Sequence, residues 1–328
     1  MRFFVTGGTG FIGSHMVELI LSRGWEVVCP VRNTASLGYL QETDVEVIPL
    51  ESIEDYATEA PSFDYVIHLA GATRALDYEG YKTANVDLTK RLLELFSGDV
   101  SDSSIKRFVL VSSQASCGPC TDDDCTPVCE TDPTCPVSLY GRSKLEAEEV
   151  ARGYAERVPI TIVRPCTVFG PRDVDCLGLF SSPRYGIVAY IGGPDRLVSV
   201  IYVEDLVDGM LKAALSPRGI GQTYFLSNRQ PVVWREFARE VARVMGHSVI
   251  GLPVPLHFLR GLGYIGDLIG KLTNRPQLFR SEKVDEMSQL AWVCSPEKAI
   301  AELDWTPSTT LEEAIRKTAA WYKEVGWI

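Results

Sequence analysis

The chain has 328 residues, of which 45% are hydrophobic and 23% are charged, and its formal net charge is -11. This length is ample for a substantial buried core without disulfides or metals to support it. An acidic chain is repelled by nucleic-acid phosphates, so we expect no nucleic-acid partner. The sequence shows neither a signal-peptide pattern nor an apolar run of roughly 20 residues, so we expect a soluble, cytoplasmic protein with no integral membrane segment.

Short apolar runs alternate with helical patterns through the first half of the chain. The expected strands are 3–5, 26–31, 45–48, 65–69, 107–112 and 160–163, and the expected helices are 15–23, 77–96 and 138–157. This alternation indicates crossover connections and a parallel sheet, hence an α/β fold. The second half predicts helices at 203–214, 234–245, 256–272 and 311–323 and a strand at 223–226. We interpret the second half as a cap over the first.

A glycine-rich turn follows the first expected strand. Its glycines fit G-x-G-x-x-G, in which one makes the turn, one lets the backbone approach a pyrophosphate and one lets the helix pack closely. The N-terminus of the next helix offers free N–H groups and a partial positive charge to the phosphates. We predict a dinucleotide site here, and a plain structural turn is the alternative. The predicted contacts are Gly7, Gly10, Phe11, Ile12 and Gly13.

The residue that follows the second strand distinguishes the two nicotinamide cofactors. An acid there binds the ribose 2′-hydroxyl of NAD, whereas an arginine binds the 2′-phosphate of NADP. The sequence reads Cys29-Pro-Val-Arg32-Asn33 and has no acid. A charge-assisted contact between arginine and phosphate is worth roughly 1.5 to 3 kcal/mol. We therefore predict NADP, with NAD as the alternative and a solvated loop arginine as the other interpretation of Arg32.

Tyr140 and Lys144 lie one helical turn apart, so their side chains share one face of the helix. A nearby ammonium is expected to lower the pKa of a phenol from about 10. Such a tyrosine gives or takes the proton at a hydroxyl while a hydride moves. Tyr78 and Lys82 repeat the spacing. Only Tyr140 follows the strand that ends at Ser112-Ser113, so we predict that Tyr140 is catalytic and Tyr78 structural.

These motifs occur in an order that resembles a known family. They are Thr6-Gly-Gly-Thr-Gly-Phe-Ile-Gly13, His68-Leu-Ala-Gly71, Asn85-Val86, Val111-Ser-Ser113, Tyr140-x-x-x-Lys144 and Arg164-Pro165. The set resembles the extended short-chain dehydrogenases/reductases of the NAD-dependent epimerase/dehydratase superfamily, over nearly the whole chain. The resemblance implies a Rossmann-type doubly wound parallel sheet with a smaller C-terminal substrate-binding cap. The expected division is 1–165 and 195–228 for the dinucleotide-binding domain, and 166–194 and 229–328 for the interleaved cap.

The resemblance also implies roles for individual residues. It makes Tyr140 the acid/base, Lys144 its modulator and a ribose ligand, and Ser113 the partner of the substrate hydroxyl. Asn85 would support the proton relay. Leu69, Ala70 and Gly71 would line the adenosine side, and Pro165 joins Tyr140 and Lys144 among the expected cofactor contacts. One departure is Leu50, near the place where the family often has an Asp facing the adenine. We also expect a homodimer.

Three segments bear on the reaction. Gln114 and Ala115 stand where the family's dehydratases carry Asp-Glu, so elimination lacks its acid and base. Val198 stands where nucleotide-sugar epimerases usually place a pyrophosphate-binding Arg, and Arg196 is two residues away. Segment 192–205 resembles the 3β-hydroxysteroid dehydrogenase branch, and Val31-Arg32 resembles dihydroflavonol reductases.

From these segments we predict NADP(H)-dependent hydride transfer to or from a secondary alcohol or ketone of a small lipophilic or ring-shaped substrate. One alternative is a nucleotide-sugar epimerase that retains its NAD(P). Another is a cofactor-binding regulatory protein without turnover, which the complete set of Ser113, Tyr140 and Lys144 disfavours.

Five of the nine cysteines fall within one short segment, at positions 117, 120, 125, 129 and 135. Their local spacing resembles that of zinc ligands. However, the loop between the pairs is short, and Asp122, Asp123 and Asp124 would raise the thiol pKa values. Zinc, a disulfide-closed loop and free thiols are the alternatives. We predict no metal, with the loop forming one wall of the substrate cleft.

The cap segment 255–272 is apolar and rich in glycine. It fits a helix that packs into the core, which is the interpretation we favour, or a wall for an apolar substrate. Peripheral membrane contact is the third interpretation, disfavoured because the polar face is not basic.

Overall fold

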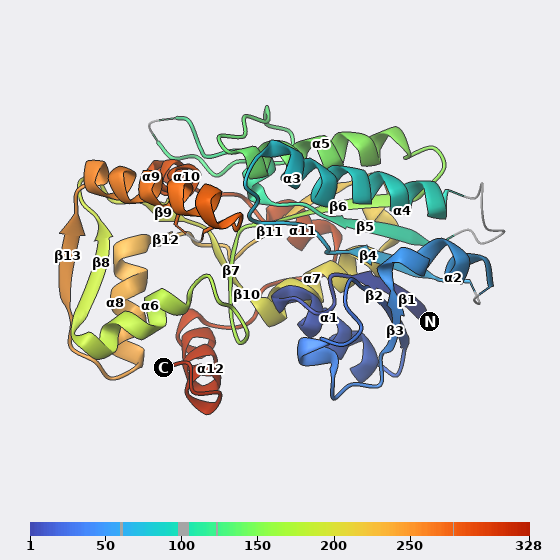
Figure 1. The fold of residues 1–328 in the computed structure, drawn as a ribbon, viewed down its shortest axis with the longest axis horizontal. Helices are drawn as coiled ribbons and strands as arrows, with labels where there is room; N and C mark the ends of the chain where they lie inside the picture. Colours follow the sequence, from blue (N-terminus) through green and yellow to red (C-terminus); the bar gives the residue numbers. More distant parts are fainter. Residues whose placement is uncertain (60–61, 98–104, 123, 278) are drawn as a thin grey trace.

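The computed structural model describes residues 1–59, 62–97, 105–122, 124–277 and 279–328 (Figure 1). Its main sheet has seven strands in the order β11-β6-β5-β4-β1-β2-β3, and all neighbours pair in parallel. These strands are β1 (Arg2–Thr6), β2 (Glu26–Val31), β3 (Glu46–Pro49), β4 (Tyr65–His68), β5 (Arg107–Val111), β6 (Ile160–Pro165) and β11 (Thr223–Leu226). The predicted parallel Rossmann-type sheet is confirmed.

Helices cover both faces of this sheet because its strands are apolar on both sides. Along β1, Phe3 and Val5 belong to one buried cluster, whereas Phe4 belongs to the cluster on the opposite face. The helices α3, α4 and α5 lie over one face, and α1 and α7 lie over the other (Figure 1). Their bounds are α1 (Phe11–Ser22), α3 (Tyr78–Tyr81), α4 (Leu88–Phe96), α5 (Leu139–Gly153) and α7 (Val203–Leu215), and α2 (Ile53–Glu59) follows β3.

The strand order places a ligand crevice at the carboxyl ends of the central strands. β1 pairs with β2 on one side and with β4 on the other, so the chain order reverses beside β1. In open α/β sheets, ligands bind at this switch point. Thr6 and His68, the last residues of β1 and β4, are register partners. The segments that follow β1, β2, β4 and β5 therefore meet at one edge, where the sequence places its motifs.

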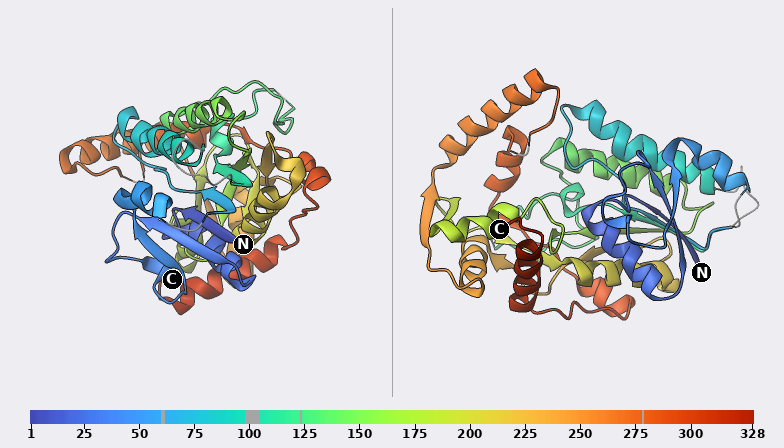
Figure 2. Two further views of the ribbon diagram at one scale, coloured as in Figure 1. Left: turned by 90° about the vertical axis from the view of Figure 1, so that its right-hand side faces the viewer. Right: turned by 60° about the horizontal axis from the view of Figure 1, so that its bottom comes forward.

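The second half adds small sheets and helices, most of which lie at the opposite end of the molecule from β3 (Figures 1 and 2). Its strands are β7 (Thr167–Phe169), β8 (Ile187–Ile191), β9 (Leu197–Val198), β10 (Val200–Tyr202), β12 (Val232–Val233), β13 (Ile250–Val254) and β14 (Ala291–Trp292). Its remaining helices are α6 (Leu177–Ser181), α8 (Trp234–Val244), α9 (Leu256–Thr273), α10 (Ser281–Ser288), α11 (Glu297–Glu302) and α12 (Leu311–Glu324). The four predicted helices of this half are present, whereas the pairing of β8 with β13 was not anticipated. The division of the chain into two interleaved domains stays a prediction.

Helix α9 does not pack into the core, so the interpretation we favoured for segment 255–272 is wrong. Its large side chains are exposed, with Leu268 at 59% and Leu272 at 78%, and its buried residues are glycines. Across the described residues, no helix is both long and apolar enough to span a bilayer.

Candidate active site

The turn between β1 and α1 contains glycines that serve two different needs. A Cβ on Gly13 would lie 2.1 Å from the Gly7 carbonyl oxygen, and Gly7 itself has φ +75° against the Ala70 backbone. These two positions require glycine for packing and conformation. A Cβ on Gly10 would meet one atom of the described chain, the Gly7 oxygen, at 3.3 Å. Gly10 thus faces open space, as expected where a pyrophosphate approaches the backbone.

The N-terminus of α1 completes an anion site. Gly10 is the N-cap residue, and it provides no side chain to accept the first N–H groups of the helix. No acidic side chain occupies the first turn. These N–H groups and the positive end of the helix dipole are therefore left for a phosphate. The residues present fit the pyrophosphate of a nicotinamide dinucleotide.

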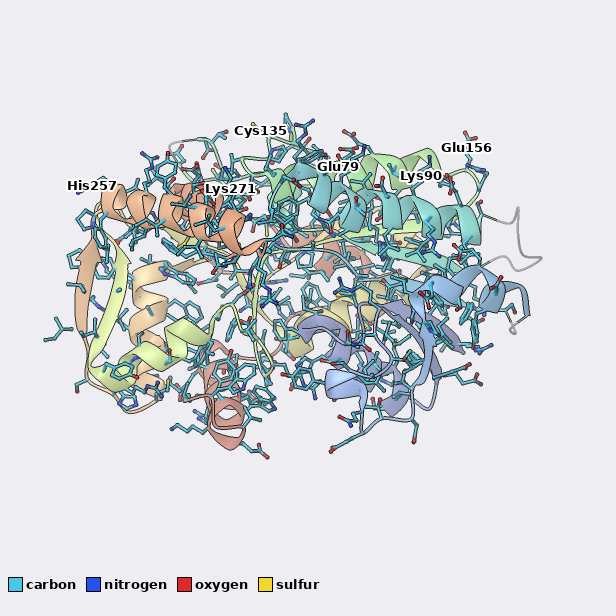
Figure 3. The ribbon with its side chains drawn as sticks, in the orientation of Figure 1. Glu79, Lys90, Cys135, Glu156, His257 and Lys271 are labelled. Atoms are coloured by element: carbon cyan, nitrogen blue, oxygen red, sulfur yellow. The ribbon has the colours of Figure 1, made fainter. Side chains whose placement is uncertain are left out.

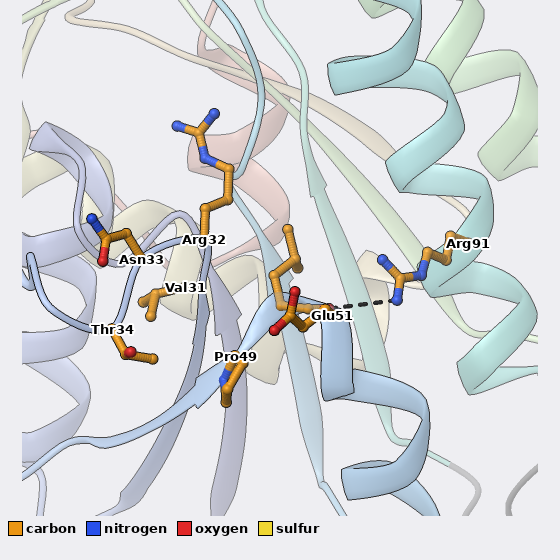
Figure 4. Close-up of a pocket in the computed structure, with 8 residues that line it drawn as sticks. Val31, Arg32, Asn33, Thr34, Pro49, Glu51 and Arg91 are labelled. Atoms are coloured by element: carbon orange, nitrogen blue, oxygen red, sulfur yellow. Dashed lines mark hydrogen bonds between the residues drawn. The ribbon is translucent and has the colours of Figure 1, made fainter.

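A cavity of about 360 Å³ lies beside the ends of β2 and β3, where the adenosine end of the dinucleotide is expected (Figure 4). It is lined by Val31, Arg32, Asn33, Thr34, Pro49, Leu50, Glu51 and Arg91. Arg91 is paired with Glu54, with Nη2 to Oε2 at 2.6 Å. Arg32 is exposed, and its side chain forms no ion pair or hydrogen bond within the described residues. It is the lining cation that remains available to an incoming anion.

The lining of this cavity includes one polar residue that the sequence did not predict. Leu50 lines the cavity and carries no polar group, as the departure from the family pattern indicated. Glu51, the next residue, lines the same cavity and supplies a carboxylate. A carboxylate here is able to accept a hydrogen bond from the adenine amino group. The sequence analysis missed Glu51 because it looked for an adenine-facing acid only at position 50, where the family often has Asp.

Asn85 and Gly71 lie close together between the expected cofactor residues and helix α5. The expected helix 77–96 contains a π-helical turn, Lys82–Asp87, which carries Asn85. Such turns occur frequently at functional sites. Asn85 accepts from the Ala72 N–H at 2.8 Å and donates to Ser143 Oγ at 2.8 Å. A Cβ on Gly71 would lie 2.6 Å from Asn85 Oδ1, so glycine is required there.

Helix α5 brings the predicted catalytic side chains to the end of β5. Ser138 caps the helix by accepting from the Gly141 N–H at 3.1 Å. The Tyr140 hydroxyl is hydrogen-bonded to the Ser113 side chain. One turn later, Lys144 Nζ donates to the Val111 carbonyl at 2.7 Å, and it lies 3.8 Å from the position of a Cβ on Gly71. The structure thus brings Ser113, Tyr140 and Lys144 together with the cofactor-side residues.

Burial sets the ionisation of this group, and its direction differs from the expectation for Tyr140. Burial raises the pKa of Tyr140 to about 12, and the Ser113 hydrogen bond opposes that rise. Burial lowers the pKa of Lys144 to about 8, and the Glu148 carboxylate opposes that fall. The predicted lowering of the phenol pKa by Lys144 is therefore wrong for this structure. The ammonium is directed at the Val111 carbonyl instead.

A buried carboxylate beneath the site was missed by the sequence analysis. Glu148 accepts from Ser112 Oγ at 2.6 Å and from Ser116 Oγ at 2.7 Å. Arg164 binds both of its oxygens, at 2.9 and 2.7 Å. This network fixes the segment that carries Ser113 against α5. Spacing in the sequence could have revealed Glu148, because it lies one turn beyond Lys144 on the same face of α5 as Tyr140.

The cap also contacts the catalytic tyrosine. Glu282 Oε1 accepts from the Tyr140 backbone N–H at 3.0 Å, and Glu282 Oε2 is bound by Arg280 at 2.7 Å. Arg280 also donates to the Tyr81 hydroxyl at 2.7 Å. The ring of Tyr81 lies 6.1 Å from that of Tyr140. Arg280 and Glu282 therefore connect the start of α10 to the active-site end of α5.

The second copy of the tyrosine–lysine spacing has different surroundings. The Tyr78 hydroxyl donates to Glu146, and the Arg142 guanidinium lies 4.5 Å from its ring centre. Burial, together with Glu146, raises the pKa of Tyr78 to about 12. These contacts tie α3 to α5, which is the structural role we predict for Tyr78.

The cysteine-rich loop is anchored to the second half of the chain. The Cys120 N–H donates to the Ala291 carbonyl at 2.9 Å, and the Val128 N–H donates to the Val293 carbonyl at 3.1 Å. All nine cysteines are free thiols in the structure. Burial, with Asp122, raises the pKa of Cys120 to about 11. Asp123 lies outside the described residues. That the loop forms a wall of the substrate cleft stays a prediction.

The fold and this arrangement define a nicotinamide-dependent enzyme of the short-chain dehydrogenase/reductase type. The profile of the NAD-dependent epimerase/dehydratase family matches residues 3–226, which is more than half of the chain. The chain belongs to this family. The recognition of an extended short-chain dehydrogenase/reductase enzyme from its motifs is thereby confirmed.

Two curated relatives and one solved structure illustrate the range of the family. A ceramide reductase of Caulobacter vibrioides is 27% identical over 338 residues, which cover 99% of this chain and 95% of that protein. A 3-beta-hydroxysteroid dehydrogenase of Mycolicibacterium neoaurum is 27% identical over 358 residues, covering 99% and 92%. The crystal structure of a UDP-glucose 4-epimerase from Thermotoga maritima with UDP-glucose has a TM-score of 0.78 at 20% identity, with 99% of both chains covered. This last likeness concerns the fold alone.

Proposed function

We propose that the protein is an NADP(H)-dependent oxidoreductase that transfers a hydride to or from a secondary alcohol or ketone of a lipophilic or ring-shaped substrate. The observation that carries the choice of an oxidoreductase over a nucleotide-sugar epimerase is the position of Arg196. Its Nη1 donates to the Pro194 carbonyl at 3.0 Å, and its Nε donates to the Met287 carbonyl at 3.1 Å. Two of the three guanidinium nitrogens are thus bound to backbone carbonyls, which favours a structural role for Arg196 over pyrophosphate binding.

The surroundings of Tyr140 support the acid/base role. Because burial raises its pKa to about 12, the phenol holds its proton at neutral pH. A protonated phenol is the form required to donate a proton to a carbonyl oxygen during reduction. A bound nicotinamide would supply the hydride. Ser113 is placed to bind the same oxygen, since its hydroxyl already touches the Tyr140 hydroxyl.

Lys144 and Asn85 are proposed to support this proton transfer. Lys144 is buried, with its ammonium held on the Val111 carbonyl at 2.7 Å. The ammonium also lies 3.8 Å from the position of a Cβ on Gly71, beside the residues expected to line the dinucleotide, so it would bind the ribose hydroxyls of a bound cofactor next to Tyr140. Asn85 donates at 2.8 Å to Ser143 Oγ, which in turn donates to the Tyr140 carbonyl at 2.7 Å. Asn85 therefore holds the helical turn on which Tyr140 lies.

The preference for NADP rests on Arg32. It lines the cavity at the end of β2, it is exposed, and it forms no ion pair within the described residues. A 2′-phosphate would give this guanidinium a charge-assisted partner. The lipophilic substrate is supported by the names of the two relatives, since ceramide and hydroxysteroids are both lipids.

The test is turnover by the purified protein with NADPH, supplied with a long-chain keto lipid, a flat ring ketone or UDP-glucose. We expect stoichiometric oxidation of NADPH with one of the ketones, and no change in the UDP-sugar. A native mass spectrum of the protein as purified is the second measurement. We expect an exchangeable, empty cofactor site and a homodimer. Retained NAD(P) together with isomerised UDP-sugar would establish the epimerase instead.

A further inference from the structure

We infer that α9 is an interfacial helix that seats the cap on a lipid surface bearing anionic headgroups. The inference rests on the proposed function only in that a lipophilic substrate resides in such a surface. His257 and Lys271, labelled in Figure 3, mark the two ends of α9, and both are exposed.

The packing of α9 is inverted relative to an ordinary surface helix. Its buried residues are Gly263, Gly266 and Gly270. A Cβ on Gly266 would lie 2.0 Å from the Phe279 carbonyl oxygen, and one on Gly263 would lie 2.9 Å from the Ser281 backbone. A surface helix normally turns its large apolar residues toward the core and its polar residues outward. Here the backbone lies directly on the protein, and the large residues point away from it.

The outward apolar residues form one continuous stripe. Their exposed fractions include 56% for Phe258, 55% for Ile265 and 78% for Leu272. Leu262, Leu268 and Ile269 are exposed on the same side. At about 100° per residue, these six positions fall within an arc of roughly 120°. An exposed stripe of this kind on a soluble protein marks an interaction site.

The flank of the stripe carries the groups that meet a lipid headgroup layer. Arg260, Tyr264 and Lys271 are exposed and fall in the next sector of the helix. Arg260 Nε lies 3.8 Å from Asp285 Oδ1 in an ion pair that is exposed on both sides, and such a pair exchanges readily for a headgroup phosphate. The acid of the helix, Asp267, is turned inward and accepts from Ser281 Oγ at 2.5 Å. Long cationic side chains and tyrosine extend from an apolar face to the headgroups of a membrane. The sequence analysis disfavoured a membrane because the polar face is not basic. The inward direction of Asp267 leaves Arg260 and Lys271 as the charged groups of the helix on its exposed flank.

The apolar surface extends from the helix into the strand before it. β13 ends at Val254 and α9 begins at Leu256, at the same end of the molecule (Figure 2). In β13, Ile250 is 77% exposed, and its register partner in β8 is Ile187, which is 43% exposed. Exposed apolar residues therefore also occur in the strand that precedes the helix.

A lipid surface fits these residues better than a second copy of the chain. An 18-residue helix is about 27 Å long and offers six apolar side chains in its stripe. Stable protein interfaces use roughly 20 to 30 residues on each side. A lipid surface would cover the stripe and the cationic flank together. It would also attract a cationic segment of a chain whose net charge is -11, while the acidic remainder stays in water.

A short chain of contacts links α9 to the catalytic centre. Gly263 and Gly266 contact the backbone of 279–281, which includes Arg280. Arg280 binds Glu282, and Glu282 accepts the backbone N–H of Tyr140 at 3.0 Å. A helix docked on lipid would thus stand one segment away from the tyrosine that acts on the substrate.

The experiment is flotation of the full chain with vesicles of phosphatidylcholine alone or mixed with phosphatidylglycerol. We expect the parent protein to float with the mixed vesicles. The double variant Ile265→Glu/Leu272→Glu should bind at least about tenfold more weakly, because two side chains leave the apolar stripe. The variant Arg260→Gln/Lys271→Gln should lose about fivefold per cation on mixed vesicles only. Ile220→Glu, at an equally apolar residue that is 52% exposed just before β11 of the main sheet, is the matched control and should bind like the parent.

The outcomes separate this inference from the proposed function. The double variant should bind NADPH and reduce a water-soluble ketone at the parent rate, which also shows that it is folded. A parent protein that reduces such a ketone but floats with neither vesicle would overturn the inference alone. Vesicle binding without any ketone reduction would contradict the proposed function alone. Sedimentation showing a parent dimer that the double variant dissociates, without vesicle binding, would assign the stripe to a second copy and overturn the inference.

Discussion

The nucleotide-binding half and helix α9 use glycine and large apolar residues in opposite ways. After β1, Gly10 faces open space, while Phe3 and Phe4 of the strand are fully buried. In α9, Gly266 is buried against a carbonyl, while Ile265 beside it is 55% exposed. In the first region glycine makes room for a ligand. In the second it lets a helix lie flat on the protein, which leaves the large residues for an outside partner.

The largest expected effect tests the chemistry in the first region. Tyr140→Phe removes the proton donor, so turnover should fall by about 10²- to 10⁴-fold, the usual contribution of general acid catalysis. Binding of NADPH should stay within about twofold, because the phenol proton serves chemistry and not affinity. Steady-state kinetics and a fluorescence titration of NADPH measure the two effects.

Tyr78→Phe is the matched control, since Tyr78 has the same spacing to a lysine but contacts Glu146 and Arg142 instead. Its turnover should stay within about threefold of the parent, because a helix-tying hydrogen bond contributes about 1 kcal/mol to stability and nothing to proton transfer. Equal losses in the two variants would remove the distinction between the two tyrosines.

The second prediction concerns the available cation at the end of β2. Arg32→Ala should weaken NADPH binding by roughly tenfold to a hundredfold, the loss of one charge-assisted phosphate contact, and leave NADH binding nearly unchanged. Titrations with both cofactors measure the ratio. Arg218→Ala, an exposed arginine just before β11 at the edge of the main sheet, is the control. A parent protein that binds NADH more tightly than NADPH would reverse the assignment.

The third prediction tests the inverted packing of α9. Gly266→Ala should destabilise the protein by about 1 to 3 kcal/mol, because the new Cβ would meet the Phe279 carbonyl oxygen at 2.0 Å. Gly261→Ala in the same helix meets nothing within 4 Å and should stabilise it by about 0.5 to 1 kcal/mol. Urea unfolding gives both values. Changes of opposite sign in the free energy of unfolding would support the inverted packing of α9. Equal destabilisation by the two variants would mean that the outer face of α9 is packed.

The smallest effect concerns the buried ammonium and its dependence on pH. Burial lowers the pKa of Lys144 to about 8, below its unfolded value of about 10.4. Between these values the unfolded chain binds the extra proton, so stability should rise with pH; below pH 8 the cost of burying the charge is fully present. The raised pKa of Tyr140 affects stability only between about pH 10 and 12, at and above the upper end of this window.

Lys144→Met isolates this contribution. The variant should gain stability near neutral pH, and its gain over the parent should shrink by about 1 to 2 kcal/mol between pH 8 and 9.5. Urea unfolding at the two pH values measures the difference. A gain that does not change with pH would show that the ammonium is not desolvated.

The sequence predicted what local geometry controls. The order of the motifs and the alternation of strands and helices fixed the parallel sheet, and one helical turn between Tyr140 and Lys144 predicted their shared face. It did not predict Glu282, because that residue reaches Tyr140 across 142 positions of the chain. The core-packing interpretation of α9 was wrong, because the sequence shows that one face of the helix is apolar but not whether the rest of the protein covers that face.

The pKa direction of Tyr140 was missed for a related physical reason. Spacing places Lys144 near the phenol, but burial and the Val111 carbonyl, both set by the tertiary fold, decide how each group ionises. The contribution of Glu51 to the nucleotide cavity likewise depends on how the segment after β3 turns.

The most direct test of the proposed oxidoreductase is the fate of the hydride. The protein is given NADPH deuterated at the transferring carbon and a ketone substrate, and product and cofactor are analysed by mass spectrometry. We expect deuterium on the carbinol carbon of the product, oxidised NADP released into solution, and neither with Tyr140→Phe. Deuterium that stays with a protein-bound cofactor while the substrate changes only its configuration would contradict the account.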